Sequence, residues 1–293
     1  MRRRGSLTYR FTGLWNGRFS NGPSAAGSPD TPMNSLWLRI RPYLSTLVRY
    51  MHISYLEAKS GYEGTALGIL WIPATTLSFS LLLGFVFHPS GTTGPIPFFL
   101  YVLSGYVTWN FISDSITRST NIIQSKFEFA VHNNLGLAGL FGKMLADRGF
   151  EFAMELAVVI IAVLVLSPFS YGPQILLLAI LIPMMCLVSL AASYLVNLLT
   201  LFFPDLGNVV STGVPIMFFA TPIFWLVEDR SDWRALLEVY NPASYYLMMM
   251  RQSFGLQPLV LHVWLIGAVI SLIVIAAGAI AYRQSNSFVR NLR

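Results

Sequence analysis

Long, uncharged, apolar stretches recur along the chain between residues 65 and 282. A helix needs about 20 apolar residues to cross about 30 Å of hydrocarbon. The pattern therefore predicts an all-α integral membrane protein with six spans, over 65–87, 95–113, 149–166, 173–203, 206–227 and 258–282. The fourth stretch is longer than a span requires, so we expect it to tilt, to kink at Pro183 or to extend beyond the bilayer.

The segment before the first span has apolar residues at three- and four-residue steps, with charged residues between them. The apolar positions are Leu36, Ile40, Leu44, Leu47, Val48, Met51 and Tyr55. One apolar stripe beside a charged face is typical of a helix at a membrane surface. We therefore predict an amphipathic interfacial helix over 36–62 on the cytoplasmic leaflet, with Pro42 at the start of its regular part. A soluble helix packed on another domain is the alternative.

The two ends of the chain are predicted to be cytoplasmic tails. Residues 1–35 are rich in Gly, Ser, Asn, Pro and Arg, which favours a flexible segment. No apolar run follows their basic start, so we do not expect a cleaved secretory signal. The six-helix transmembrane domain is expected over 63–283, and residues 284–293 form the second tail.

Residues 228–257, between the fifth and sixth spans, begin acidic and then become semi-apolar. Asn241 and Pro242 divide the segment in two. We predict two short amphipathic helices that dip into the outer leaflet as a re-entrant hairpin. Irregular backbone at that depth must be covered by protein or water, so a cavity is expected nearby.

Composition and charge agree with a membrane protein. Hydrophobic residues make up 55% of the chain and charged residues 11%, and the mean hydropathy is +0.60; soluble domains have about 25% charged residues. With both termini inside, Arg230, Arg234 and Arg251 lie outside, and the others of the 19 Lys and Arg residues are cytoplasmic. This asymmetry follows the positive-inside rule and explains the net charge of +6 without a nucleic-acid partner.

Enzyme and cofactor motifs are missing from the sequence. The lone cysteine, Cys186, lies in an apolar run and is expected to be a buried structural thiol. The four histidines have no metal-ligand spacing, and no GxxxxGK[ST] phosphate loop occurs. We therefore predict no catalytic residue, no metal site and no cofactor bound by this chain.

Few ionisable residues lie within the predicted spans. Glu151 and Glu155 share a helix face, so they are either a proton relay or a pair at the cytoplasmic end of span three, near the basic 114–148 segment. Asp114 and Arg118 are expected to form a local ion pair. Without an energy source of its own, the protein either takes energy from a partner or is not a pump.

Aromatic side chains are frequent in and near the spans. Aromatic faces stack on sugar rings, although packing and interfacial anchoring are the simpler interpretation of any single ring. The candidates for lining a glycan channel are Tyr101, Tyr106, Trp109, Phe218, Phe219, Phe224 and Trp225.

Three segments together resemble one family. They are YEGTALGILWIP at 62–73, FFPDLGNVV at 202–210 with FFATPIFW at 218–225, and Asn241-Pro242 followed by Arg251 and Gly255. This pattern resembles the membrane subunit of type-2 ABC exporters of O-antigen, capsule, teichoic acid and related lipid-linked glycans. The resemblance covers residues 40–283, and its second segment is the most specific.

The resemblance implies a multi-pass permease of the bacterial inner membrane with both termini in the cytoplasm. It would work as a homodimer with two copies of a separate ABC ATPase subunit, which binds ATP and Mg²⁺, and would export lipid-linked polysaccharide. A helix within 119–134 would couple ATP binding to the spans, together with the interfacial helix. The candidate coupling residues are Glu57, Lys59, Glu63, Lys126, Phe127 and Glu128. The candidate outer-gate residues are Tyr240, Asn241, Pro242, Tyr245 and Arg251.

Two positions depart from the family pattern. A basic residue is usual where Glu63 stands, and an aromatic–proline pair is replaced here by Phe129-Ala130. Two other functions stay open at this stage. One is a type-2 ABC permease for a drug, lipid or haem, and the other is a membrane-embedded transferase that would use Glu151, Glu155 or His262.

Overall fold

The structure is a computed structural model that describes residues 32–88, 95–126, 128, 132, 136–170, 172–227 and 233–290. Two compact units, residues 1–45 and 46–293, are described separately. In the first unit, residues 32–45 are the beginning of helix α1 (Pro32–Gly61). The helix starts ten residues before Pro42, so the predicted start was wrong. Pro32 occupies the favourable first turn instead, and Pro42 lies inside the helix.

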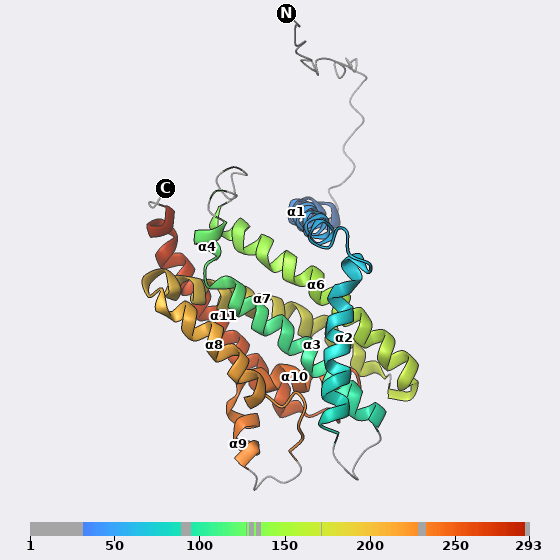
Figure 1. Cartoon of the computed structure of the whole chain (residues 1–293). Helices are drawn as coiled ribbons and strands as arrows, with labels where there is room; N and C mark the ends of the chain where they lie inside the picture. Colours follow the sequence, from blue (N-terminus) through green and yellow to red (C-terminus); the bar gives the residue numbers. More distant parts are fainter. Residues whose placement is uncertain are drawn as a thin grey trace, which may run out of the picture. The chain divides into compact units, whose positions relative to one another are not determined.

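The secondary-structure elements among the described residues of the second unit are all helices (Figure 1). Five helical segments are long and apolar enough to cross a membrane, at Gly68–Val86, Ile96–Ser119, Leu137–Leu166, Pro173–Phe202 and Leu261–Ser285. They correspond to α2 (Trp71–Val86), α3 (Pro95–Ser119), α6 (Leu137–Leu166), α7 (Leu178–Phe202) and α11 (Leu261–Arg290). The 3₁₀ turn at Gly68–Leu70 extends α2 to 19 residues, and the turn at Pro173–Leu177 leads into α7. Five of the six predicted stretches are thus matched by a long helix.

The predicted fifth span corresponds to the shorter helix α8 (Asp205–Ala220), which has 16 residues. A helix of this length covers about 24 Å, less than the hydrocarbon thickness. It stops before the predicted end at 227 because the residue before a proline avoids the helical conformation. Thr221, which precedes Pro222, is extended, with φ −100° and ψ 138°. Pro215, by contrast, lies within the helix.

Helix α6 begins at Leu137, twelve residues before the predicted start of the third span. The sequence prediction excluded this part because it contains Lys143, Asp147 and Arg148. The structure accommodates these charges in ion pairs with neighbouring elements. The third span was therefore predicted in the right place but with the wrong beginning.

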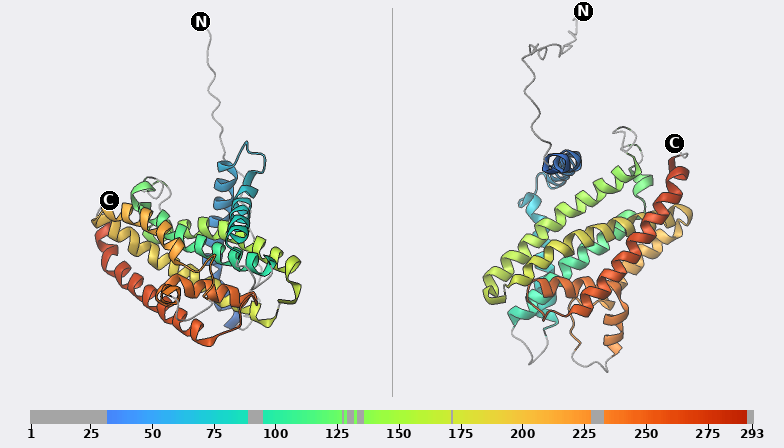
Figure 2. Two further views of the ribbon diagram at one scale, coloured as in Figure 1. Left: turned by 60° about the horizontal axis from the view of Figure 1, so that its bottom comes forward. Right: turned by 180° about the vertical axis from the view of Figure 1, so that it is seen from behind.

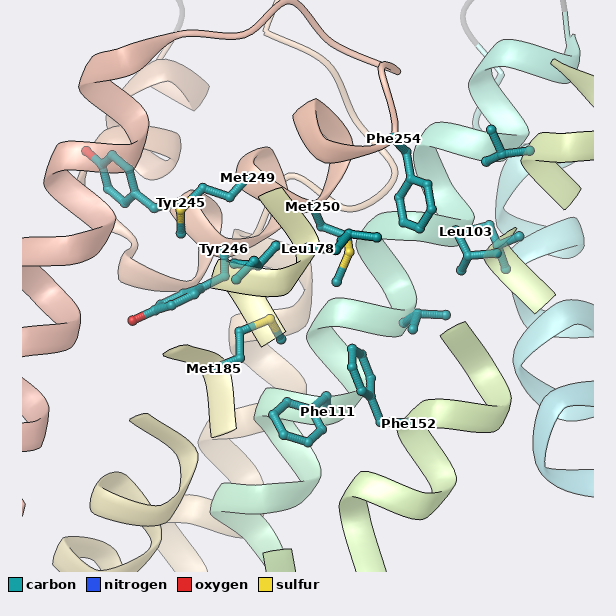
Figure 3. Packing of buried hydrophobic residues seen from close by; sticks show 14 of the residues in the cluster. Leu103, Phe111, Phe152, Leu178, Met185, Tyr245, Tyr246, Met249, Met250 and Phe254 are labelled. Carbon is teal, nitrogen blue, oxygen red and sulfur yellow. The ribbon is translucent and has the colours of Figure 1, made fainter. Parts of the chain in front are cut away.

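Helix α3 is the centre of this unit, and contacts α2, α6, α7, α8 and α10 (Pro242–Ser253). Its apolar face packs in the main core beside α6, α7 and α10, where Phe111 contacts Phe152 and Met250 and Phe254 lie nearby (Figure 3). These large side chains belong to the largest contiguous group of buried apolar residues in the unit. The start of α6, α4 (Ile122–Ser125) and the end of α11 lie at one end of the bundle (Figures 1 and 2).

Two short helices, α9 (Trp233–Tyr240) and α10, stand between α8 and α11. Asn241 separates them, and its side-chain oxygen accepts a hydrogen bond from the Ala243 amide at 3.0 Å. Pro242 fills the first helical position, where its missing N–H costs nothing. The division predicted at Asn241-Pro242 is confirmed, whereas the depth of this pair in a membrane stays a prediction.

Candidate functional site

Four charged residues lie near the beginning of α6, in a helix that is otherwise strongly apolar. They are Lys143, Asp147, Arg148 and Glu151, and their spacing of three and four residues lets neighbouring charges pair along the helix. They form two groups that contact different elements.

The first group is centred on Asp147. Its Oδ1 accepts hydrogen bonds from the Ser54 hydroxyl at 2.6 Å and from Lys143, and its Oδ2 lies 3.7 Å from the Lys126 ammonium. Lys143 is buried, and also donates to Glu57 Oε2 at 2.8 Å. The group therefore joins the end of α1, the start of α6 and the residue that follows α4.

The second group joins α6 to α3. Arg148 is buried, pairs with Glu151 and lies 3.1 Å from Asp114. Arg118 donates to both Glu151 oxygens at 3.0 Å and lies 3.4 Å from Asp114. The predicted Asp114–Arg118 pair is confirmed. Glu151 lies beside Arg118 and Arg148, in agreement with the predicted position near the basic 114–148 segment.

Glu155 has separate partners one turn further along α6. Its Oε1 accepts hydrogen bonds from Thr76 on α2 and Asn110 on α3, both at 2.8 Å. The side chain is only 3% exposed. Glu151 is thus engaged with two arginines, whereas Glu155 connects three helices.

The aromatic candidates gather in one cluster around Phe218, near the end of α8. The centre of the Phe218 ring lies 6.2 Å from the ring centres of both Tyr106 and Trp109. It lies 5.3 Å from the ring centre of Phe219 and 5.5 Å from that of Phe224. Tyr101 belongs to the same cluster, and Trp225 packs against it. Phe219 is 66% exposed, so the cluster continues onto the surface of the described unit.

Sequence reasoning missed Phe79 on α2, whose ring lies 5.0 Å from Tyr106 and 6.1 Å from Phe218. Nothing in the uniform apolar pattern of 65–87 distinguishes it from its neighbours. It also missed Lys143 and Asp147 as site residues, although two opposite charges four residues apart in an apolar helix were a usable signal.

A fully buried arginine connects α10 with two other elements. Arg251 donates from Nη2 to the carbonyl oxygens of Pro222 at 2.7 Å and Ile223 at 3.3 Å, and from Nε to that of Tyr101 at 3.2 Å. Its guanidinium carbon also lies 3.4 Å from the centre of the Tyr101 ring, a cation–π contact. Arg251 thus connects α10 with α3 and with the segment that follows α8.

Asn241 and Tyr101 strengthen the same connection. Asn241 Nδ2 donates to the Thr221 hydroxyl at 2.7 Å, and the Tyr101 hydroxyl donates to the carbonyl oxygens of Pro222 and Trp225. We call the residues Tyr101, Thr221, Pro222, Asn241 and Arg251 the outer clasp. Its members come from α3, the segment after α8, and the start and end of α10.

The other gate candidates lie beside the outer clasp. Tyr245 is buried and donates to the Val239 carbonyl at 2.9 Å, whereas Tyr240 is 80% exposed and Pro242 is exposed. An apolar cavity of about 250 Å³ lies next to this hairpin, between α3, α7, α8, α10 and α11, with Asn241, Pro242 and Tyr246 in its wall.

The coupling candidates divide between paired and exposed residues. Glu57 and Lys126 are both attached to α6 through Lys143 and Asp147. Lys59, Glu63 and Glu128 are exposed, and Phe127 lies outside the described residues.

No group of three His, Cys, Asp or Glu side chains that could hold a metal ion occurs among the residues that the structure describes. Cys186 is half-buried against the main core rather than fully buried. The distinctive features of the described residues are ion pairs, a cluster of tilted and edge-on aromatic rings and a clasped hairpin.

Comparison with known proteins identifies similar chains. The chain is 24% identical over 214 residues to an O-antigen export system permease protein RfbA of Klebsiella pneumoniae, covering 69% of this chain and 78% of the relative. A second such protein of that organism is 22% identical over 216 residues, with the same coverage. The corresponding protein of Myxococcus xanthus is 24% identical over 195 residues, or 64% of this chain and 72% of the relative. No family model matches the chain. These similarities support the resemblance to type-2 ABC permeases of O-antigen export.

Proposed function

Because this chain is similar to O-antigen export permeases, we propose that it is the permease subunit of an ATP-driven exporter of lipid-linked polysaccharide. The observation that carries the proposal is that the similarity extends over 78% of the first two relatives' length. Five apolar helices long enough to cross a membrane fit a transport component. The energy would come from a separate ATPase subunit.

The proposed topology has six crossings of the inner membrane and both termini in the cytoplasm. Helix α8 is too short to cross alone, but Thr221–Val227 continues from it, and Arg251 and Tyr101 bind the carbonyl groups of this segment. Non-helical backbone is tolerated at membrane depth when protein satisfies its polar groups. The outer clasp therefore supports a crossing by α8 and its extension, which would be the fifth of six crossings in chain order.

The ATPase is proposed to dock where the end of α1, Lys126 and the start of α6 meet. This region is polar, and it has exposed charged groups at Glu57, Lys59 and Glu63. Apolar side chains on the same half of α1, among them Val48 and Leu56, are also exposed. That pairing of a charged face with an apolar face supports an interfacial helix between headgroups and the ATPase.

The polysaccharide is proposed to pass along the aromatic cluster around Phe218, between two copies of the chain. Rings present flat apolar faces that contact sugar rings without fixing one register, which permits sliding. Phe219 offers an exposed ring continuous with this cluster. The hairpin of α9 and α10, held by the outer clasp, would be the outer gate of this path.

The decisive experiment is a clean deletion of the gene with complementation. We expect deletion cells to lose surface polysaccharide and to accumulate lipid-linked polymer inside, and the wild-type gene to reverse both changes. Co-purification of the tagged chain with an ABC ATPase subunit is the second expected result. Normal surface polysaccharide in the deletion strain would contradict the proposal, and loss of drug, lipid or haem export instead would favour that alternative cargo.

A further inference from the structure

The Asp147 carboxylate is shared among three elements of the second unit. Its Oδ1 is engaged with Ser54 on α1 and with Lys143 on its own helix, while its Oδ2 faces Lys126 after α4 at 3.7 Å. The two oxygens thus face different partners. A single carboxylate on α6 therefore binds both the end of α1 and Lys126, the residue that follows α4.

The contacts of Asp147 differ in how easily they can break. The Lys143 side chain is 2% exposed, and a buried ammonium left without its carboxylates would be strongly unfavourable. Lys126 is 42% exposed, and an ion pair at that exposure contributes only about 0–1 kcal/mol. The contact to Lys126 can therefore break and re-form while the contacts to Lys143 and Ser54 persist.

We propose that Asp147 is a positioning residue that transmits displacement of Lys126 to α1 and α6, with Lys126 as its releasable partner. The inference rests on the proposed function, in which the ATPase docks where the end of α1, Lys126 and the start of α6 meet. When the ATPase displaces Lys126 from Oδ2, the charge on Asp147 is shared between Lys143 and Ser54 alone. The strength with which Asp147 holds the end of α1 to α6 then depends on whether Lys126 is bound.

The molecule provides a matched control in the second ion-pair group. Arg118 is 46% exposed and pairs with Glu151 on α6, so it resembles Lys126 in charge, exposure and type of partner. It differs in lying on α3 and in pairing with Glu151 rather than with Asp147. Because Arg118 makes two 3.0 Å hydrogen bonds, its loss should affect stability at least as much as loss of Lys126, but only Lys126 should affect energy coupling.

The test compares Lys126→Gln, Asp147→Asn and Arg118→Gln in the permease–ATPase complex reconstituted with lipid-linked polysaccharide. We expect Lys126→Gln and Asp147→Asn to keep ATP hydrolysis within about twofold of wild type while polymer exported per ATP falls about three- to fivefold. Arg118→Gln should keep the wild-type ratio. Equal ratios for Lys126→Gln and Arg118→Gln would overturn the inference, and a wild-type complex without export would overturn the proposed function as well.

Cross-linking gives a readout that a purely structural role would not change. The single cysteine permits a Cys186→Ala background, into which Lys126→Cys and Asp147→Cys are introduced together. We expect a short bifunctional thiol reagent to join them in the nucleotide-free complex, and a non-hydrolysable ATP analogue to lower the yield several-fold. A yield independent of nucleotide, in a complex that still hydrolyses ATP, would overturn the inference. If the Asp147 variants fail to fold, the comparison of Lys126→Gln with Arg118→Gln still decides it.

Discussion

At the residue scale, the outer clasp depends on the space beside Gly105. A Cβ added at Gly105 would lie 2.4 Å from Arg251 Nη2, within the guanidinium that binds Pro222 and Tyr101. The arginine has no room to retreat, because its hydrogen bonds to carbonyl groups fix it from several sides. Glycine at this position is therefore required by close approach rather than by backbone conformation.

We expect Gly105→Ala to lower the free energy of unfolding by about 1–3 kcal/mol, through overpacking against a fixed group. Gly149→Ala is the control, because a Cβ at Gly149 meets no atom within 4 Å and alanine favours the helix. Thermal unfolding in detergent measures both variants. Equal melting temperatures for the two would show that Arg251 moves aside without cost.

Side-chain contacts could be predicted from the sequence when both partners are close together in the chain, and not when they are far apart. The Asp114–Arg118 pair and the Asn241 cap were predictable, since each involves residues within one helical turn. The role of Arg251 was not, because its acceptors are carbonyl oxygens of α3 and of the segment after α8, far away in the sequence. Because every residue has a backbone carbonyl, the sequence does not show which carbonyl groups accept these hydrogen bonds.

At the element scale, α7 and α11 come unusually close at Gly278. A Cβ on Gly278 would lie 2.7 Å from the Ala191 Cβ and 2.9 Å from the Ala191 Cα. Small residues let two helix backbones approach within a membrane, where dispersion contacts replace the hydrophobic driving force. Since the obstacle includes backbone, accommodation requires the helices to separate.

We expect Gly278→Ala to lower the melting temperature clearly more than Gly267→Ala on the same helix. At Gly267 the added Cβ would meet the end of the flexible Met249 side chain, which can change rotamer. The comparison uses one helix and one substitution, so helix propensity cancels. An equal effect at both sites would contradict a close contact between α7 and α11.

Sequence patterning located the elements well and their ends less well. Apolar runs identify helices because a span needs an uninterrupted apolar surface, and these runs corresponded to α2, α3, α7 and α11. It failed at the beginning of α6, where charged side chains are neutralised by partners from α1 and α3. It also failed at the end of α8, where Thr221-Pro222 ends the helix inside an apolar run.

At the scale of the whole molecule, the number of crossings depends on α8. If α8 and Thr221–Val227 cross together, Trp233 lies outside and Gln284 lies in the cytoplasm. If they do not cross, Trp233 lies on the cytoplasmic side and Gln284 on the outer side. The two arrangements therefore predict opposite positions for these residues.

Single cysteines in a Cys186→Ala background distinguish the arrangements. Ser60, Phe169, Trp233 and Gln284 are exposed on the described unit and suit labelling. With six crossings, a membrane-impermeant maleimide added to cells with a permeabilised outer membrane labels Phe169→Cys and Trp233→Cys but not Ser60→Cys or Gln284→Cys. Disruption of the inner membrane should then expose the latter two. Labelling of Gln284→Cys but not Trp233→Cys in unbroken cells would mean five crossings, and would place the two ends of the chain on opposite faces of the membrane.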